Sequence, residues 1–270
     1  MITSSQNDII YSIYRPAGND TALVRGTHFD KDTKKKINDL IMARHSNVEQ
    51  VGFVDTDGRY ELQMAGGEFC GNATRSAAWY YLAGQPGDLR IRVNSKDEVS
   101  AGVTVDKKAW SEMPLYRGAD AITQIEDDLF MVKLEGITIL VLRPRRAAPY
   151  LQDKSSLKQV ATNFIDQYNL RGSEAVGVMF CEEVEASLKI HPIVWVRDID
   201  TLFYETACGS GSTAVGIVAA WDSASSQQLD ILQPSWMTIT VAVSYQNGSI
   251  QKATISGIVE NDGQEYRLQI

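Results

Sequence analysis

The sequence predicts an α/β (α+β) protein made of two structurally similar halves. Most of its 270 residues fall into short segments with alternating or β-branched side chains, bounded by Gly, Asn or Asp, as is typical of strands. Helical patterns are few. Two stretches, EFCGNATRSAA (68–78) and YETACGSGSTAVG (204–216), each place a cysteine before glycine and a run of small residues.

The first half is expected to begin with strands and to contain two helices. A helix is predicted over 31–46, where apolar residues recur behind a charged entry, and its lysines are interpreted as a solvated face. A second helix is predicted over 72–82, directly after the first Cys-Gly pair. The strands of this half are predicted at 9–15, 21–26, 50–55, 60–66, 89–95 and 99–106.

The same order of strands, helix, strands and a Cys-Gly helix returns between residues 128 and 221. The apolar run ITILVL (137–142) predicts a buried strand and is too short to span a bilayer. Helices are expected over 155–170 and 212–221. Arg143, Arg145 and Arg146 could steer an acidic substrate, but they are interpreted as a charged strand edge. The boundary between the halves is placed near 114–120, and the last strands fit either half.

Composition excludes several classes of function. The net charge of −8 and the pI near 5.0 argue against a nucleic-acid binder, which would need a basic face. The start of the sequence has no basic region followed by an apolar run, so we expect neither a signal peptide nor a membrane partner. Three cysteines are a poor count for a disulfide scaffold, so we expect a cytoplasmic protein.

The two Cys-Gly stretches place Cys70 and Cys208 where a helix begins. The first N–H groups of a helix have no partner within the helix and carry a partial positive charge, which binds anions such as carboxylates. The same field lowers the pKa of a nearby thiol from about 8.5 toward neutrality. The glycines that follow, Gly71 and Gly209, allow close approach of a ligand. Asn72 and Ser210 could cap the helix or donate to that ligand.

Two such helix starts suit one reaction if both face one amino acid. One thiolate removes the proton from the α-carbon, and the opposite thiol delivers a proton to the other face. Preorganised N–H donors stabilise the charge that develops on the carboxylate. The third cysteine, Cys181, ends an apolar strand and is interpreted as structural. The histidines lie too far apart in sequence to suggest a metal site.

The motifs CGNATRSA (70–77) and ETACGSGSTA (205–214) resemble the two cysteine motifs of the diaminopimelate epimerase family. These are amino-acid racemases and epimerases that use no pyridoxal phosphate and no metal. PAGND (16–20) and WSEMP (110–114) resemble further stretches of that family, and PAGND places Asn19 as a substrate contact. The resemblance covers essentially the whole chain.

The resemblance implies two pseudo-symmetric halves, each a curled sheet around a central helix, with the active site in the cleft between them. It also implies that the final strand returns to the first half. The expected domains are therefore 1–116 with about 261–270, which carries Cys70, and 117–260, which carries Cys208. A homodimer is usual in the resembling family and is expected here.

Two departures argue against diaminopimelate as the substrate. The family's Asn-Pro-His triplet is missing from EGITILVLRPRR (135–146). The arginine that grips the distal carboxylate is missing from RDIDTLFYETAC (197–208). A site without that charge-assisted pair should bind a second carboxylate poorly.

Further shared features are PxGN near the start, EQVGF (49–53), EFCGNAT (68–74), MP (113–114) and a tyrosine followed by Glu before CGSG. Through them the sequence most resembles the histidine racemases of staphylopine-type metallophore biosynthesis. It implies that Glu49 accepts an N–H from the substrate's imidazole and that Gln50 is a neighbouring polar contact, although Glu49 also fits a solvated loop carboxylate. Glu205 is assigned either to the substrate's amino group or to capping of the second Cys-Gly helix. A racemase for another amino acid, an isomerase of the phenazine-biosynthesis type and a non-catalytic amino-acid binder remain the alternatives. Paired cysteines count against the last two.

Overall fold

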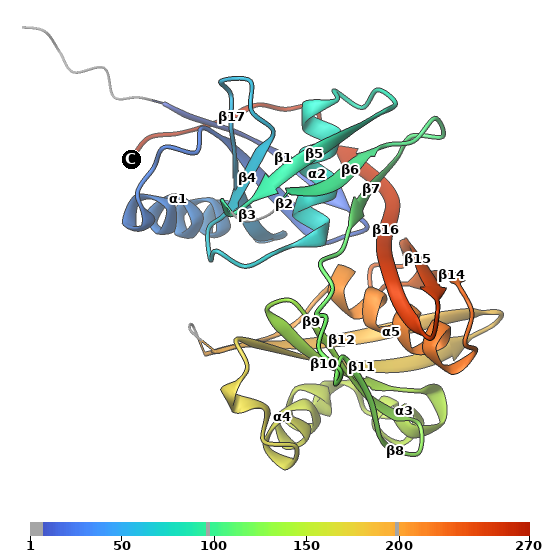
Figure 1. The fold of residues 1–270 in the computed structure, drawn as a ribbon. Helices are drawn as coiled ribbons and strands as arrows, with labels where there is room; N and C mark the ends of the chain where they lie inside the picture. The colour runs from blue at the N-terminus through green and yellow to red at the C-terminus, as the bar shows by residue number, and fades with distance from the viewer. Residues whose placement is uncertain (1–7, 96–97, 198–199) are drawn as a thin grey trace, which may run out of the picture. The chain divides into compact units, whose positions relative to one another are not determined.

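The structure, a computed structural model, describes residues 8–95, 98–197 and 200–270 (Figure 1). The chain divides into two compact units. The first is Met1–Ser111 with Ile258–Ile270, and the second is Glu112–Gly257. The predicted boundary between the two halves lay between residues 116 and 117, and the chain was expected to return to the first half at about residue 261.

In the first unit, short strands alternate with two helices. The order is β1 Ile9–Pro16, β2 Asp20–Arg25, α1 Lys31–Arg44, β3 Val48–Val54, β4 Glu61–Met64, α2 Gly71–Tyr81, β5 Gly87–Val93, β6 Glu98–Val103 and β7 Lys108–Glu112. The chain returns to this unit at the end of β16 and in β17 Tyr266–Leu268, and both pair with β1. The final strand therefore lies in the first unit.

The second unit follows a similar order. Its elements are β8 Ile122–Glu126, β9 Leu129–Leu134, β10 Ile137–Leu142, α3 Pro144–Leu151, η1 Lys154–Ser156, α4 Leu157–Gln167, η2 Leu170–Gly172, β11 Ala175–Val184, β12 Ser187–Val196, β13 Thr201–Tyr204, α5 Gly209–Asp222, β14 Gln227–Leu232, β15 Thr238–Gln246 and β16 Ser249–Asn261. The predicted buried strand over 137–142 is confirmed as β10, whose last five residues are buried.

The strand pairings follow the same order in each unit. In the first, β1–β2 is antiparallel, β2–β3 parallel across α1, β3–β4 antiparallel, β4–β5 parallel across α2, and β5–β6 antiparallel. In the second, β9–β10 is antiparallel, β10–β11 parallel across α3 and α4, β11–β12 antiparallel, β12–β14 parallel, and β14–β15 antiparallel. Helix α5 occupies the β12–β14 crossover, as α2 occupies the crossover before β5.

Helices α2 and α5 each lie among the strands of their own unit. Helix α2 contacts β1, β2, β3, β5 and β6, and α5 contacts β9, β10, β11, β12, β14 and β15. Small side chains make this possible, since residues 71–78 of α2 are all buried. A Cβ atom on Gly216 of α5 would lie 2.6 Å from Cγ1 of Val241 on β15, which shows how closely helix and strand approach. The mixed, sheet-dominated α+β class is confirmed.

The structure corrects the interpretation of the arginines at 143–146. They do not mark a strand edge, because Arg143 is the N-cap of α3 and the next three residues form its first turn. Pro144 occupies the first helical position, where its fixed φ and missing N–H favour a helix start. Side-chain ion pairs join Arg143 to Asp222 and Arg146 to Glu126 on the surface.

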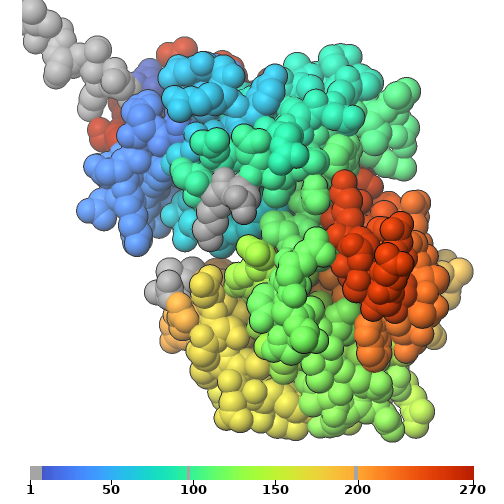
Figure 2. Space-filling model, in the orientation of Figure 1, coloured from blue at the N-terminus to red at the C-terminus, as the bar shows by residue number. Residues whose placement is uncertain are grey.

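The predicted helices agree with the structure apart from their ends. The helix expected over 155–170 ends at Gln167, because Asn169 adopts the left-handed conformation (φ 56°) that stops a helix. Helix α1 lies at the surface of the first unit, in blue in Figure 2. Its Lys35 and Lys36 are exposed as expected, whereas Lys34 is half-buried over the ring of Phe53. Within the described residues, no helix is long and apolar enough to cross a membrane.

Candidate active site

Cys70 and Cys208 each form the N-cap of a helix, with nearly the same backbone geometry. The φ and ψ angles are −128° and 112° at Cys70 and −127° and 107° at Cys208. Each Sγ accepts a hydrogen bond from the N–H three residues later, from Ala73 at 3.4 Å and from Gly211 at 3.2 Å. Both sulfur atoms therefore lie at the positive end of a helix, where a thiolate is stabilised.

A hydroxyl group in the first turn of each helix strengthens this arrangement. Oγ1 of Thr74 donates to the carbonyl of Cys70 (2.8 Å), and Oγ of Ser212 donates to the carbonyl of Cys208 (2.7 Å). Both bonds reach back four residues, so they fix the carbonyl of the N-cap against the helix. The two helix starts thus agree in their backbone angles, in the hydrogen bond that each sulfur accepts and in the hydroxyl group that bonds each N-cap carbonyl.

A β-bulge places polar side chains beside Cys70. In the parallel pair β2–β3, Asp20 is opposite Val48 and Thr21 is opposite Gln50, so Glu49 is the extra residue of the bulge. A bulge interrupts the ladder and redirects side chains, and bulges are frequent next to active sites. Here it brings Glu49 and Gln50 to the same end of β2 as Asn19.

Hydrogen bonds join the side chains of this region. Nδ2 of Asn19 donates to Oε2 of Glu49 (3.0 Å), and Nε2 of Gln50 donates to Oδ1 of Asn19 (2.5 Å) and to Oγ1 of Thr21 (2.7 Å). The Cys70 thiol donates to Oε1 of Gln50 (2.8 Å). Asn19 is only 5% exposed. The first unit therefore brings together Asn19, Glu49, Gln50 and Cys70, four of the residues singled out in the sequence.

The turn that carries Asn19 is held by its neighbour Asp20. The guanidinium of Arg15 makes two hydrogen bonds to the Asp20 carboxylate (2.7 and 2.9 Å), and Nδ2 of Asn47 donates to it at 2.5 Å. Asp20 is buried and Arg15 is half exposed. Asp20 is thus a structural residue that orients the turn before β2.

Arg75 is a buried charge that the sequence did not single out. It lies on α2 and is fully buried. Its Nη2 donates to Oδ1 of Asn72 (2.8 Å) and to the carbonyl of Pro16 (3.3 Å). Among the described residues, its Nε and Nη1 atoms have no hydrogen-bond partner. Burial lowers the pKa of Arg75 to about 10, while a negative charge on Cys70 raises it.

These contacts give Arg75 a defined position in the site. It links the turn before Asn19 to the first turn of the Cys70 helix. It also orients the side chain of Asn72, because a guanidinium only donates and must face the amide oxygen. The amide nitrogen of Asn72 is then the donor end of that side chain. The sequence shows Arg75 only as the arginine of the CGNATR motif and does not reveal that its side chain is buried.

Gln233 orients the start of the Cys208 helix, as Arg75 orients the first turn of the Cys70 helix. This fully buried side chain accepts the N–H of Cys208 at Oε1 (2.9 Å), and its Nε2 donates to Oγ of Ser212 (3.0 Å) and to the carbonyl of Ile231 (2.9 Å). Two of these three bonds fix the start of α5, and the third joins the amide to β14. Gln233 lies 25 residues after Cys208. No motif in the sequence marked it.

Gly211 allows the Cys208 thiol to sit against the helix. A Cβ atom on Gly211 would lie 2.2 Å from Sδ of Met179 and 3.1 Å from Sγ of Cys208. Met179 is fully buried, so its side chain would have to shift within the core. The corresponding residue of the first helix is Ala73, so the two helix starts differ at this position.

Gly211→Ala is therefore expected to destabilise the protein. Overpacking costs about 1–3 kcal/mol, which outweighs the gain of about 1 kcal/mol that alanine gives in a helix, so we expect a net loss of about 1 kcal/mol. Urea unfolding measures this change. Gly172→Ala is the matched control, because a Cβ there meets nothing within 4 Å. Equal stability of the Gly211 variant and the parent protein would contradict the close packing.

The remaining predicted contacts lie at the two helix starts. Gly71 and Asn72 are buried in the first turn of α2, while Gly209 is buried and Ser210 half-buried in the first turn of α5. Glu205 is half-buried in the segment between β13 and α5, and its N–H donates to the carbonyl of Pro192 (3.1 Å). Each unit thus groups its own predicted residues around its own cysteine.

Cys181 and His191 lie in the core of the second unit. Cys181 is 1% exposed on β11, and burial raises the pKa of its thiol to about 12. His191 bonds through Nε2 to Glu182 (2.7 Å) and through Nδ1 to Tyr204 (2.6 Å). Across residues 8–95, 98–197 and 200–270, no group of three or more His, Cys, Asp or Glu side chains could hold a metal ion.

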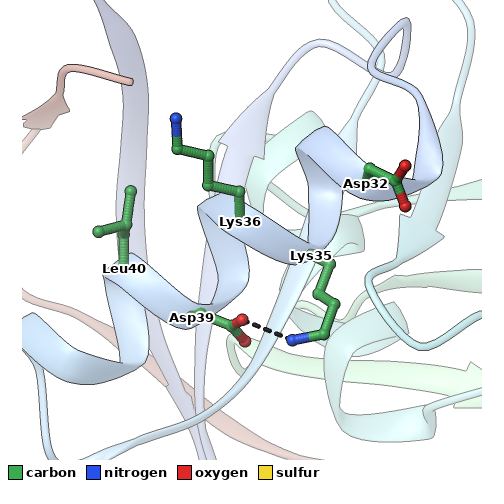
Figure 3. A pocket seen from close by; sticks show the side chains of 5 residues that line it. All are labelled: Asp32, Lys35, Lys36, Asp39 and Leu40. Atoms are coloured by element: carbon green, nitrogen blue, oxygen red, sulfur yellow. Dashed lines mark hydrogen bonds and ion pairs between the residues drawn. The ribbon is translucent and has the colours of Figure 1, made fainter.

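A shallow surface pocket lies on α1, away from these residues. Figure 3 shows its lining, which comes entirely from the outer face of that helix: Asp32, Lys35, Lys36, Asp39 and Leu40. Nζ of Lys35 pairs with the carboxylate of Asp39 at 2.6 Å, four residues along the helix. Such pairs are common on exposed helices. None of the predicted site residues lines this pocket.

Comparisons in sequence identify similar proteins. The family described as "Histidine racemase CntK N-terminal domain" matches residues 8–264. A histidine racemase from Fusobacterium nucleatum subsp. nucleatum is 30% identical over 216 residues, which cover 74% of this chain and 77% of that protein. A histidine racemase from Staphylococcus aureus is 26% identical over 219 residues, which cover 77% and 79%.

Comparisons of structure agree with the fold. A phenazine biosynthesis protein of the PhzF family from Bacillus anthracis has a TM-score of 0.65 and 13% identity, covering 98% of this chain and 100% of that one. A hydroxyproline epimerase from Agrobacterium vitis, solved with bound trans-4-hydroxy-L-proline, has a TM-score of 0.58 and 13% identity, covering 97% and 93%. At such low identity these likenesses establish the fold alone.

Proposed function

We propose that this chain, which belongs to the histidine racemase family and is an isomerase, inverts the α-carbon of histidine by a two-base mechanism. Cys70 and Cys208 are the two bases in this proposal, and the reaction needs no cofactor. The observation that carries it is the matching geometry of the two N-cap cysteines, each with its sulfur at a helix start.

The mechanism moves two protons. The thiolate of one cysteine removes the α-proton and becomes a thiol, while the thiol of the other gives its proton to the opposite face and becomes a thiolate. The scheme requires that both sulfur atoms reach one α-carbon from opposite sides. The shared order of strand pairings supports the proposal that the two units are pseudo-symmetric halves. The cleft expected between them stays a prediction.

The two helix starts would bind the α-carboxylate of the substrate. In this proposal the N–H groups of Gly71 and Asn72 on one helix, and of Gly209 and Ser210 on the other, donate to it. Charge flows onto that carboxylate when the α-proton leaves, so these fixed donors bind the transition state more strongly than the substrate. Glu205 would contact the amino group of the substrate.

The bulge residue Glu49 would select the side chain of the substrate. A carboxylate has two oxygens with about four acceptor positions, so Glu49 can accept an imidazole N–H beside its bond to Asn19. Asn19 and Gln50 hold Glu49 and Cys70 in a fixed relation. Histidine is therefore the substrate that this site favours, and other amino acids are the alternative.

Arg75→Met tests the support of the carboxylate site. We expect activity to fall by about 10²-fold, mainly through a higher KM, because Asn72 loses the bond that orients its amide. The free energy of unfolding should change by less than about 2 kcal/mol, since relief from burying a charge offsets the lost hydrogen bonds. Steady-state kinetics and urea unfolding measure both quantities.

Arg75→Lys separates geometry from charge. Lysine keeps the charge but cannot reproduce the planar guanidinium that bonds Asn72 and Pro16. We expect it to restore little activity. Full activity in Arg75→Met would contradict a positioning role, and full rescue by lysine would show that charge alone matters.

The function itself is tested by proton NMR in D₂O with purified protein and no added cofactor. The panel contains L-histidine, diaminopimelate and other L-amino acids. We expect the α-proton signal of histidine to disappear while D-histidine forms. Turnover of a different amino acid would favour the alternative substrate. Binding of histidine without turnover would favour a non-catalytic binder, which the retention of both thiols argues against. The homodimer and the cytoplasmic location stay predictions.

A further inference from the structure

A continuous chain of hydrogen bonds leads from the Glu49 carboxylate to the Cys70 thiol. The thiol donates to Oε1 of Gln50 (2.8 Å), Nε2 of Gln50 donates to Oδ1 of Asn19 (2.5 Å), and Nδ2 of Asn19 donates to Oε2 of Glu49 (3.0 Å). We call these four side chains the thiol relay. They come from the turn before β2, from β3 and from the start of α2.

The direction of every bond in the thiol relay follows from Glu49. An ionised carboxylate only accepts, so Asn19 must turn its amide nitrogen toward Glu49 and its oxygen toward Gln50. Gln50 must then turn its nitrogen toward Asn19 and its oxygen toward Cys70. A carbonyl oxygen cannot donate, so the last bond exists only when Cys70 carries its proton.

The surroundings of the thiol relay keep this direction fixed. Nε2 of Gln50 has a second acceptor in Oγ1 of Thr21 (2.7 Å), and Thr21 is fully buried. The Gln50 amide therefore has two reasons to keep its nitrogen away from Cys70. Chains of hydrogen bonds that point one way strengthen each other, and they do so most where water is excluded.

Charged groups around Cys70 act in opposite directions. Arg75 on α2 favours the thiolate of Cys70, and so does the helix start. The thiol relay, which ends on the charge of Glu49 from β3, favours the protonated thiol. Glu68, two residues before Cys70, turns its carboxylate over Gly66. Arg75 and Glu49 therefore act on the protonation of Cys70 in opposite directions.

We propose that the thiol relay couples recognition of the substrate side chain at Glu49 to the protonation of Cys70. This inference rests on the proposed function. In the free enzyme the relay holds a proton on Cys70, so Cys70 acts as the acid and Cys208 as the base. The α-proton passes to the Cys208 thiolate, and the Cys70 proton passes to the other face of the α-carbon.

Bound histidine would then also change how firmly Cys70 holds its proton. An imidazole N–H that donates to Glu49 makes this carboxylate a weaker acceptor for Asn19. The bonds from Asn19 to Gln50 and from Gln50 to Cys70 weaken in turn, and the thiol gives up its proton more easily. A side chain without a donor leaves the thiol relay unchanged. Selectivity for histidine would thus be expressed in the rate of proton transfer as well as in binding.

The test is the pH dependence of alkylation of Cys70 by iodoacetamide in the full-length Cys208→Ala protein. Cys181 is buried and does not compete. Gln50→Met removes the acceptor of the thiol, and Glu49→Gln removes the charge at the end of the relay. Gln50→Met should lower the pH midpoint by about 0.5 to 1 unit, the equivalent of one hydrogen bond. Glu49→Gln should lower it by a smaller amount, because it acts on the thiol through Asn19 and Gln50.

Glu135→Gln is the matched control. It removes the same charge as Glu49→Gln from an exposed turn between β9 and β10 and leaves the path from Cys70 to Glu49 intact, so its midpoint should equal that of the parent Cys208→Ala protein. Thermal unfolding checks that each variant is folded. Midpoints of the Gln50 and Glu49 variants that match the control, or that lie above it, would overturn the thiol relay.

A second arm adds saturating L-histidine. The midpoint should fall in the Cys208→Ala protein and stay constant when Glu49→Gln is added. A midpoint that does not respond, although histidine slows alkylation, overturns the coupling. No effect of histidine on either rate or midpoint means that histidine does not bind. That result counts against the proposed substrate, while the midpoints without histidine still decide on the thiol relay.

Discussion

Replacing Cys70 or Cys208 by serine is expected to lower racemisation of histidine by about 10²- to 10⁴-fold, the usual contribution of a general acid or base. Serine keeps the shape of the side chain, but its hydroxyl is far too weak an acid to supply a base near neutral pH. Because each thiol acts in every turnover, loss of either one should be equally severe in both directions. Chiral chromatography of the products measures the effect.

The third cysteine provides the control. Cys181→Ala removes a thiol that is buried and held neutral by its surroundings, so activity should be retained.

The two active-site variants should also differ from each other in D₂O. Each keeps one base and should exchange the α-proton of one enantiomer only, and the enantiomers should be opposite. Full activity in Cys70→Ser or Cys208→Ser would refute the two-base scheme.

The second large effect is expected at Glu49. Glu49→Gln should lower kcat/KM for histidine by about 10- to 10²-fold, the value of a hydrogen bond to a charged group. Amino acids whose side chains cannot donate should lose much less. The quantity to compare is the ratio of kcat/KM for histidine to that for such an amino acid.

Glu135→Gln is the control for this variant. It removes the same charge from an exposed turn between β9 and β10 of the other unit, so its kinetics should match those of the parent protein. An equal loss for every amino acid in Glu49→Gln would mean that Glu49 supports the thiol or the fold without selecting the side chain.

The sequence was most informative where local chemistry decides the structure. A cysteine before Gly and small residues predicted two helix starts, and both cysteines are indeed N-caps. The run ITILVL predicted its buried strand because a short apolar run rich in β-branched residues is typical of a strand that is buried on both faces. The Arg-rich stretch was misread because Pro144 starts a helix of only eight residues, in which Pro149 disturbs the helical pattern.

The parts of the site that depend on tertiary contacts were less accessible. Glu49 meets Asn19 only through the parallel pairing of β2 with β3 and its bulge, and neither leaves a mark in the sequence. These residues were singled out by resemblance alone. Gln233 and Arg75 were missed because a single Gln or Arg reads as a surface residue until its burial is known.

Deuterium incorporation at early times of reaction in D₂O tests the two-base mechanism most directly. Purified protein converts a small fraction of L-histidine, and the α-position of both enantiomers is then examined by mass spectrometry. With one base on each face, the new D-histidine carries deuterium while the recovered L-histidine keeps its proton. Deuterium appearing in the recovered L-histidine as fast as D-histidine forms would mean that one base serves both faces, and would contradict paired action of Cys70 and Cys208.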